Sequence, residues 1–392
     1  MVKHVLYLSY DGMTDPLGQS QVLPYIVGLT KAGYTFHLIS FEKPERYAEN
    51  RATIEAVCAE NNINWLPLKY TKRPPLLSTV WDVMKMKRLA KSLHKKYGLS
   101  LIHCRSYLSA LIGLSFKHKF SIPFLFDMRG FWADERVDGK IWDLKNPIYK
   151  LVYDFFKRKE ILFLNQSDFT VSLTHAGKNE MLNWKGVNGL IDKIEVIPCC
   201  ADLTLFKPVE RDKEDFNLGY LGSLGTWYML KEMLMVYKAI LQEIPEAKFH
   251  FLTKDTPDII YEQAKELGIS TENILVEESE RKDIPFKTRN WNYSVFFILP
   301  CFSKLSSSPT KQGELMGMGI PIICNSGVGD VDTIVEQFRS GIVVDVYSKF
   351  DFSLNKSFDQ DNIVFGAHEY FSLKNGVEKY RGIYQQLIIV NK

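Results

Sequence analysis

The sequence predicts an α/β protein made of two doubly wound domains, each built on a parallel sheet. Its 392 residues exceed what one ordinary hydrophobic core takes up. Short apolar runs alternate with helical patterns in both halves of the chain, at the spacing of βαβ units. A charged stretch, Lys207–Asp215 (KPVERDKED), separates the two series. Together these observations predict two lobes joined by a polar linker.

The first series begins with Lys3–Ser9 (KHVLYLS), whose continuous apolar character is typical of a buried parallel strand. A loop over Tyr10–Gln19 follows it. The expected strands are Lys3–Ser9, Phe36–Phe41, Trp65–Leu68, Leu101–His103 and Phe124–Asp127, the last of which is expected to close the series. The expected helices are Ser20–Ala32, which Gly33 ends, Glu45–Asn61 and Thr79–Tyr97.

The second series repeats the alternation. Its expected strands are Phe216–Leu221, Lys248–Thr253, Ile274–Val276, Val295–Leu299, Ile320–Cys324 and Gly341–Val344. Its expected helices are Leu230–Ile244, Asp258–Leu267, Gly313–Met318 and a last one over Ser372–Ile389. The sequence therefore predicts an N-terminal domain over 1–206, a second domain over 207–375 and a C-terminal helix over 376–392 that packs back toward the first. Ligands of such sheets bind outside the carboxyl ends of the strands, so we expect them in a cleft between the lobes.

Composition limits the classes of function. Hydrophobic residues make up 46% and charged residues 24%, as in soluble globular proteins. A net charge of +3 argues against a dedicated nucleic-acid binder. The six cysteines form no C-x-x-C pair and have no histidine at metal-ligand spacing, which indicates a reducing compartment and no metal site. The first residues lack a signal-peptide pattern, and no apolar run approaches the roughly 18 residues of a membrane span. We therefore expect a cytoplasmic protein.

The segment Ser306–Asn325 (SSSPTKQGELMGMGIPIICN) carries the strongest signal for a ligand site. Lys311 is expected just before a short helix, and Glu314 on its first turn. Backbone N–H groups at a helix N-terminus, with a lysine beside them, form a phosphate site. A carboxylate one turn away can accept both hydroxyls of a ribose. On spacing alone, a solvated Lys–Glu pair near a helix start explains the pattern equally well.

This segment resembles the nucleotide-sugar site of the GT-B glycosyltransferases, in particular the retaining glycosyltransferase family 4. A K-x-x-E-x-x-x-x-G-x-P pattern is common in that family, and Lys311, Glu314, Gly319 and Pro321 match it. The resemblance implies two Rossmann-like domains that face each other across a cleft. Other stretches that agree with the family in order are Tyr10–Tyr25, Ile197–Pro208, Gly219–Leu224 and Val328–Asp330 followed by Gly341.

Carried over by position, the resemblance implies that Glu314 binds the donor ribose and Lys311 binds its phosphates. Gly222 and Ser223 are expected to face the diphosphate through backbone N–H and hydroxyl groups. Gly18 is expected to let the first-domain loop approach the diphosphate and the transferred sugar, with a simple turn glycine as the alternative. The family also implies a nucleotide-sugar donor, retention of anomeric configuration, and no metal or other cofactor.

Three departures from the family pattern concern the mechanism. Two glutamates with seven residues between them are frequent in the family, but Ser306 stands at the first place, which affects recognition of the transferred sugar. A basic pair often follows the donor-domain turn, whereas this chain has Ser223 and then Trp227 or Tyr228. The lysine named above is therefore expected to be the main cation on the diphosphate. Asp127–Gly130 (DMRG) replaces a histidine that many members have in the first domain.

Charged residues follow two strand ends of the first domain. Arg129 is expected to clamp a phosphate of donor or acceptor, and Asp127 or Asp134 to orient the acceptor hydroxyl. The alternative is an Asp–Arg ion pair that only holds the loop. His103, two residues before Arg105, is interpreted as a packing histidine. The catalytic candidates are thus Asp127, Arg129 and Lys311, and the acceptor-binding candidates are Arg105 and Asp134.

Residues 69–96 combine nine basic residues with apolar ones at helical spacing, and contain a single acidic residue. A basic amphipathic helix of this kind can dock on an anionic membrane surface. The alternative is an ordinary surface helix with its apolar side in the core.

The sequence thus predicts a glycosyltransferase of the hexosyltransferase type. Its expected acceptor is a glycan or lipid-linked saccharide in cell-surface polysaccharide synthesis, at the inner face of the membrane. A front-face substitution needs no protein nucleophile, which fits the absence of a convincing one. A sugar-nucleotide epimerase of the same fold and a non-catalytic nucleotide-sugar-binding protein stay open as alternatives. A dehydrogenase is disfavoured because no G-x-G-x-x-G follows either first strand.

Overall fold

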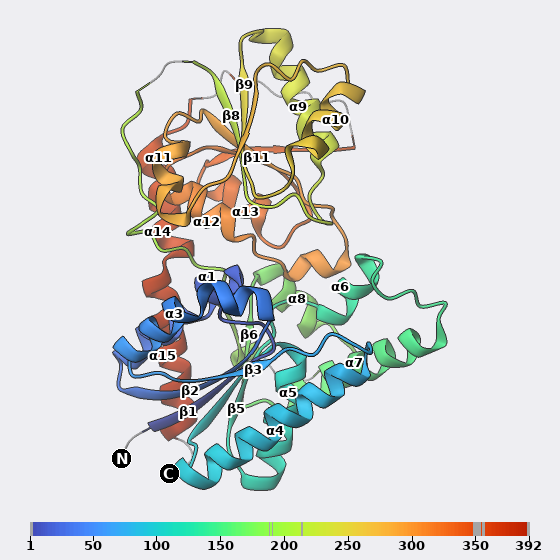
Figure 1. Ribbon diagram of the computed structural model, residues 1–392, viewed down its shortest axis with the longest axis vertical. Coiled ribbons are helices and arrows are strands. Elements are labelled where there is room, and N and C mark those ends of the chain that lie inside the picture. Colours follow the sequence, from blue (N-terminus) through green and yellow to red (C-terminus); the bar gives the residue numbers. More distant parts are fainter. Residues whose placement is uncertain are drawn as a thin grey trace. The chain divides into compact units, whose positions relative to one another are not determined.

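The computed structural model describes residues 3–187, 189, 191–212, 215–347, 354 and 357–389, and the chain divides into two compact units (Figure 1). Unit 1 combines Met1–Ile197 with Leu373–Lys392, and unit 2 is Pro198–Ser372. The change of unit therefore comes at Pro198 and not at residue 207. The reason is local packing: the Ala201 amide donates to the Phe371 carbonyl, and Phe206 lies in the core of unit 2. Lys213 and Glu214 of the charged stretch lie outside the described residues.

The sheet of unit 1 is parallel, with the strand order β3-β2-β1-β4-β5-β6-β7. The expectation that the strand series closes at Asp127 is wrong, because two more strands follow. They are only four and three residues long, FTVS and IEV, and their polar residues obscure the apolar pattern. The strands are β1 Lys3–Ser9, β2 Tyr34–Glu42, β3 Asn64–Lys69, β4 Leu101–Arg105, β5 Phe124–Asp127, β6 Phe169–Ser172 and β7 Ile194–Val196.

The helices of unit 1 cover this sheet and include the C-terminal helix, red in Figure 1. The helix expected over 20–32 is divided at Val22, because Pro24 lacks an N–H and its ring opposes the carbonyl four residues earlier. The helices are α1 Pro16–Gln21, α2 Leu23–Thr30, α3 Pro44–Glu60, α4 Leu77–Tyr97, α5 Ser106–Phe120, α6 Trp132–Asp138, α7 Pro147–Gln166, α8 His175–Leu182, the 3₁₀ turn η1 Ile191–Lys193 and α15 Leu373–Ile389.

The sheet of unit 2 is also parallel, in the order β10-β9-β8-β11-β12-β13. Its strands are β8 Asn217–Leu221, β9 Lys248–Leu252, β10 Ile274–Glu277, β11 Tyr293–Phe296, β12 Ile322–Asn325 and β13 Gly341–Val344. Its helices are α9 Leu230–Glu243, α10 Pro257–Glu266, η2 Arg281–Asp283, α11 Ile284–Thr288, η3 Phe302–Ser306, α12 Thr310–Gly317, α13 Val331–Gln337 and α14 Gln360–Phe371.

The strand order fixes where each unit can bind a ligand. In unit 2 the chain proceeds from β8 outward to β9 and β10 and then returns to β11 on the other side of β8. In unit 1 it proceeds from β1 to β2 and β3 and returns to β4 on the other side of β1. Loops at such reversals diverge, and ligands of doubly wound sheets bind there, at the carboxyl ends of the strands.

Candidate functional site

Lys311 lies at the reversal point of unit 2. It is the second residue of α12, so it stands inside the helix and not before it. The side chain is buried, with 6% of its surface exposed. Its Nζ lies 4.1 Å from the ring centroid of Tyr220 on β8 and 3.8 Å from that of Tyr228. Within the described part of the chain, this Nζ has no hydrogen-bond partner.

Burial lowers the pKa of Lys311 well below its ordinary value, and the negative charges of Glu314 and Asp255 offset part of this effect. The faces of the aromatic rings attract an ammonium group, but they provide no acceptor atom for its N–H groups. A buried amine without an acceptor is costly. A phosphate oxygen would supply both the missing acceptor and the missing negative charge.

The turn after β8 lies beside this amine. Gly222 has a φ of +102°, and a Cβ built there would lie 3.4 Å from Lys311 Nζ. Its amide donates to the Leu252 carbonyl, so the expectation that this N–H faces the diphosphate is wrong. The sheet ladder between β8 and β9 simply continues through it. Ser223 is exposed, and its carbonyl accepts from the Tyr220 hydroxyl at 2.6 Å.

Asp255, which the sequence analysis did not single out, holds this turn. Its Oδ2 accepts from the Leu224 amide and, at 2.9 Å, from the Thr253 hydroxyl. Because Asp255 lies in the loop after β9, it links the loops after two neighbouring strands. An aspartate just beyond a predicted strand end was the signal that could have indicated it.

Glu314 is buried on the second turn of α12, since the helix begins at Thr310 and not at Gly313. Its Oε1 forms an ion pair with Arg281 Nη2 at 2.8 Å. Burial raises the pKa of Glu314, and the Arg281 and Lys311 charges oppose that rise. The Arg281 guanidinium also lies 4.7 Å from the Phe206 ring centroid. Nothing in the sequence spacing pointed to Arg281, because η2 is distant from α12 along the chain.

The two aromatic residues at the place of the family's basic pair each contact a lysine from another segment. Tyr228 contacts Lys311, as described, and the Trp227 ring centroid lies 3.7 Å from the Nζ of Lys304 on η3. Lys304 is buried, and so is Ser306 at the end of the same turn. The cations near this turn therefore come from η3 and α12 instead of from the turn itself.

In unit 1, Asp127 and His103 form a buried polar cluster with two tyrosines of α15. Asp127 Oδ2 lies 3.3 Å from His103 Nε2 and accepts from the Tyr380 hydroxyl at 3.2 Å. His103 Nδ1 pairs with the Tyr384 hydroxyl at 2.7 Å. Burial lowers the pKa of His103 despite the Asp127 charge. Burial would raise the pKa of Asp127, but Arg129, His103 and Arg105 together lower it.

The structure brings Asp127, Arg129 and Arg105 to the same edge of the first sheet. Arg105 and Asp127 are register partners on β4 and β5, and Arg129 Nη1 lies 3.9 Å from Asp127 Oδ1. Arg105 Nε lies 3.4 Å from Asp11 Oδ2 in the loop after β1. Arg105, from one strand, thus meets Asp127 and Arg129, from the end of the next strand, at the carboxyl edge of the sheet.

Asp134 is placed differently. Its two carboxylate oxygens accept from the Tyr153 hydroxyl and from Lys157 Nζ, both at 2.8 Å and both from α7. The side chain is buried, which favours a structural role in holding α6 on α7. Gly18 lies in α1, not in a turn, and a Cβ there would come within 2.2 Å of the Gly12 carbonyl oxygen. Its role is close packing of α1 on the loop after β1.

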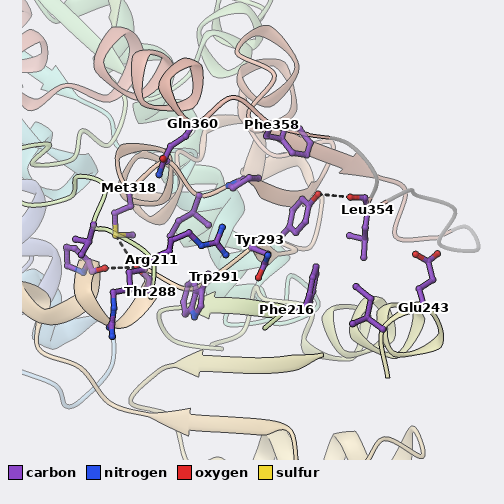
Figure 2. Close-up of a pocket in the computed structure, with 18 residues that line it drawn as sticks. Arg211, Phe216, Glu243, Thr288, Trp291, Tyr293, Met318, Leu354, Phe358 and Gln360 are labelled. Carbon is purple, nitrogen blue, oxygen red and sulfur yellow. Dashed lines mark hydrogen bonds between the residues drawn. The ribbon is translucent and has the colours of Figure 1, made fainter. Parts of the chain in front are cut away.

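A cavity of about 560 Å³ opens at the opposite edge of the second sheet (Figure 2). Its walls include Phe216, Tyr293 and Pro321, which stand at the amino ends of β8, β11 and β12. Figure 2 shows the Tyr293 hydroxyl donating to the Leu354 carbonyl at 3.2 Å. This cavity lies away from the carboxyl ends where doubly wound sheets bind ligands.

Comparison with known proteins agrees with this architecture. Residues 21–205 match the family described as Glycosyltransferase Family 4. Sucrose-phosphate synthase from Thermosynechococcus elongatus superimposes with a TM-score of 0.72 at 14% identity, over 99% of this chain and 100% of that one. The fold is GT-B, and the chain resembles glycosyltransferase family 4.

Other GT-B structures extend the comparison. Anabaena HepE, in complex with UDP and glucose, gives a TM-score of 0.66 at 13% identity, over 97% of this chain and 99% of that one. UDP-GlcNAc 2-epimerase from Neisseria meningitidis, bound to UDP-GlcNAc, gives 0.52 at 12% identity, over 99% and 94% of the two chains. No curated protein matches the chain. The GT-B fold thus includes both transferases and epimerases, and the chain's own residues have to decide between them.

Proposed function

We propose that this chain transfers a sugar from a nucleotide diphosphate sugar to a hydroxyl of its acceptor, with retention of anomeric configuration. The observation that carries the proposal is the buried Lys311, whose Nζ lacks a hydrogen-bond partner within the described residues and lies beside Gly222. The match to Glycosyltransferase Family 4 and the UDP and glucose bound to HepE support it.

In this proposal Lys311 and the Ser223 hydroxyl bind the diphosphate, and Glu314 accepts the ribose hydroxyls. Breaking the bond between the anomeric carbon and the phosphate oxygen places negative charge on the leaving diphosphate. A positive group already fixed at that position stabilises the transition state without reorganising. Lys311 meets this requirement once the diphosphate is bound, because the phosphate charge favours the protonated amine. Helix packing holds its stem and the aromatic rings hold its amine. No metal or other cofactor takes part in the proposed reaction.

The acceptor oxygen attacks the anomeric carbon on the face from which the phosphate departs. The acceptor's proton passes to the leaving phosphate oxygen, which gives the new glycosidic bond and a nucleoside diphosphate. No protein nucleophile is needed. Because Asp127 is buried and bonded to His103 and Tyr380, we propose that it positions Arg129 and does not itself touch the acceptor.

Donor binding and transfer test the proposal together. Thermal unfolding with UDP-, GDP- and dTDP-sugars should show a rise in Tm with one donor, because ligand binding stabilises the native state. We expect Lys311→Ala and Glu314→Ala to abolish that rise and the transfer activity while leaving the circular dichroism spectrum unchanged. Lys231→Ala, at an exposed lysine of α9, is the matched control. Full donor binding and transfer in both site variants would remove the assignment.

The epimerase alternative predicts a different product. Incubation with a UDP-sugar and no acceptor would yield the 2-epimer if the chain were an isomerase. A transferase yields no epimer under these conditions and yields nucleoside diphosphate only when acceptor is added. A protein that binds the donor but gives neither product would be a non-catalytic binding protein.

We propose further that the acceptor is a glycan or a lipid-linked saccharide and that α4 docks the enzyme on an anionic membrane. Large apolar side chains of α4 are exposed: Leu77 at 69%, Val80 at 55% and Trp81 at 48%. They do not pack into the core, as the ordinary surface-helix alternative requires. Basic residues follow them on the same helix, at Arg88 and Lys91 among others. Within the described residues, no helix is long and apolar enough to cross a membrane.

A second row of exposed apolar residues, on α7, supports the membrane-docking proposal. Ile148, Leu151 and Phe155 on α7 are exposed at helical spacing, and both helices belong to unit 1. Membrane attachment through such surfaces combines apolar insertion with attraction of basic residues to anionic lipid.

Flotation with vesicles tests the membrane proposal. We expect the protein to float with phosphatidylglycerol-containing vesicles at low salt, and to lose binding at high salt or with neutral vesicles. Trp81→Ser and the triple change Arg88→Gln, Lys91→Gln and Lys95→Gln should each weaken binding. Leu275→Ser, at an exposed leucine of unit 2, should leave it unchanged. Absence of flotation at low salt would contradict the proposal.

A further inference from the structure

The reversal point of the first sheet carries two arginines with buried side chains. Arg105 is the last residue of β4, and Arg129 follows the end of β5 by two residues. The side chains of Arg105 and Arg129 are 5% and 9% exposed. The buried carboxylate of Asp127 lies between them in the sequence and interacts electrostatically with both. Arginine stays protonated in proteins, so both side chains carry a positive charge.

Among the described residues, the groups beside Arg105 add little negative charge. Burial lowers the pKa of His103, so its ring is neutral, and burial raises the pKa values of Tyr7 and Tyr380, so their hydroxyls stay protonated. Asp11 lies 3.4 Å from Arg105 Nε, but its side chain is 53% exposed and water screens it.

One donor atom of this cluster lacks an acceptor. Arg105 Nη1 is buried and has no hydrogen-bond partner among the residues that the structure describes. Leaving a charged donor buried and unsatisfied costs more than leaving a neutral one. An unsatisfied guanidinium at the carboxyl edge of a doubly wound sheet therefore points to a ligand group that accepts from it.

The backbone at both arginines is strained. Ser106, directly after Arg105, has a φ of +66°, and Arg129 has a φ of +59°. These are left-handed conformations that residues other than glycine rarely adopt, and each costs about 1 kcal/mol or more. The strain lies at the ends of two adjacent strands, beside the two guanidinium groups.

We infer that Arg105 and Arg129 bind an anionic group of the acceptor, a phosphate or a carboxylate. The identification of the ligand as the acceptor rests on the proposed function, whereas the binding of the anion does not. A planar guanidinium fork matches both groups, and it binds them through two parallel hydrogen bonds. The acceptor would thus be recognised by its charge at unit 1, and a neutral sugar would lack the group that satisfies Arg105.

Anion binding by the full-length chain tests this inference. The Lys311→Met background removes the phosphate-binding amine proposed for unit 2. In that background, Tm is measured against glucose 1-phosphate, inorganic phosphate, glucuronate and glucose. We expect the phosphates or the carboxylate to raise Tm and glucose to have no effect. A rise in Tm with the phosphates indicates a phosphate acceptor, and a rise with glucuronate indicates a carboxylate acceptor.

Variants in the same background locate the site. Arg105→Gln should weaken anion affinity at least tenfold, and Arg105→Lys, which keeps the charge but loses the fork, should weaken it less. Arg46→Gln, at an exposed arginine of α3, is the matched control and should bind normally. If Arg105→Gln fails to fold, the anion affinity of Arg105→Lys tests the inference instead. The inference is overturned if no anion raises Tm, or if the rise is the same in every variant. Anion binding without any transfer would leave this site in place and contradict only the proposed reaction.

Discussion

Lys311 is almost completely buried, and its amine has no hydrogen-bond partner in the described structure. This arrangement lowers the stability of the folded state and favours the binding of an anion. Replacing it by methionine keeps a stem of similar volume and removes the unsatisfied charge. We expect Lys311→Met to raise the free energy of unfolding by about 1–3 kcal/mol, the cost of an unsatisfied buried polar group. Affinity for the nucleoside diphosphate should fall roughly 10- to 100-fold, the worth of one charge-assisted hydrogen bond.

Chemical unfolding and isothermal titration with UDP, GDP and dTDP measure the two effects on the same protein. The control is Lys231→Met on α9, which should change neither quantity because the side chain is exposed. A Lys311→Met protein that loses both stability and affinity would show that the amine is satisfied in the folded state. A gain in the free energy of unfolding together with a loss of affinity indicates a residue that serves ligand binding and not the stability of the fold.

The lowered pKa of Lys311 also makes stability depend on pH. The folded-state pKa lies well below the unfolded value of about 10.4. Between these two values the unfolded chain holds a proton that the folded chain does not. The free energy of unfolding therefore rises with pH, by at most about 1.4 kcal/mol per unit from this group. The penalty is complete below the folded-state pKa and vanishes above about 10.4.

Lys311→Met lacks this contribution, so its advantage in stability over the wild type should shrink as pH rises. Urea unfolding of both proteins at pH 7, 8 and 9 measures the gap, and the comparison cancels the other titrating groups. A gap that stays constant over this range would show that Lys311 keeps its proton in the folded state.

At the scale of elements, the sequence predicted what depends on local pattern. Every expected strand exists, because apolar runs bounded by turns reflect burial on both faces of a parallel sheet. Helix α12 with Lys311 and Glu314 was visible from spacing within one segment. The partner Arg281 was not visible, because contacts between distant loops depend on the strand order, which spacing does not encode. The role of Glu42 was hidden for the same reason: its carboxylate, at the end of β2, accepts from the Met13 and Thr14 amides.

Helix α1 shows how such a contact constrains one residue. A Cβ at Gly18 would lie 2.2 Å from the Gly12 carbonyl oxygen and 2.5 Å from the Met13 Cα, and both are backbone atoms that cannot turn aside. We expect Gly18→Ala to lower the free energy of unfolding by roughly 1–3 kcal/mol, the usual cost of overpacking.

The matched change is Gly382→Ala in α15, where an added Cβ meets nothing within 4 Å. It should raise the free energy of unfolding by about 1 kcal/mol, because alanine favours helix over glycine. Urea unfolding of the two variants gives opposite shifts in midpoint. Equal stability of Gly18→Ala and the wild type would mean that α1 can move away from the loop after β1 at no cost.

For the whole molecule, the way the chain is shared between the two units decides which part folds alone. Unit 2 is one continuous segment whose ends meet where the Ala201 amide donates to the Phe371 carbonyl. Its hydrophobic core and the Lys311 site lie entirely within it. Unit 1 needs two segments, because α15 provides the tyrosines that bond to His103 and Asp127.

We therefore expect the fragment 198–372 to unfold cooperatively and to bind the nucleoside diphosphate within about tenfold of the full chain. The fragment 1–197 should fail to fold for two reasons. Losing α15 leaves the buried His103 Nδ1 without its partner, at about 1–3 kcal/mol, and takes the Tyr380 hydrogen bond from Asp127. It also exposes the apolar residues beneath the helix. Adding a peptide of residues 373–392 should restore its structure. Circular dichroism, urea unfolding and titration calorimetry on the separate fragments measure these outcomes. A folded 1–197 that ignores the peptide would show that α15 only covers a unit already complete, and a 198–372 that binds no nucleoside diphosphate would remove the donor site from unit 2.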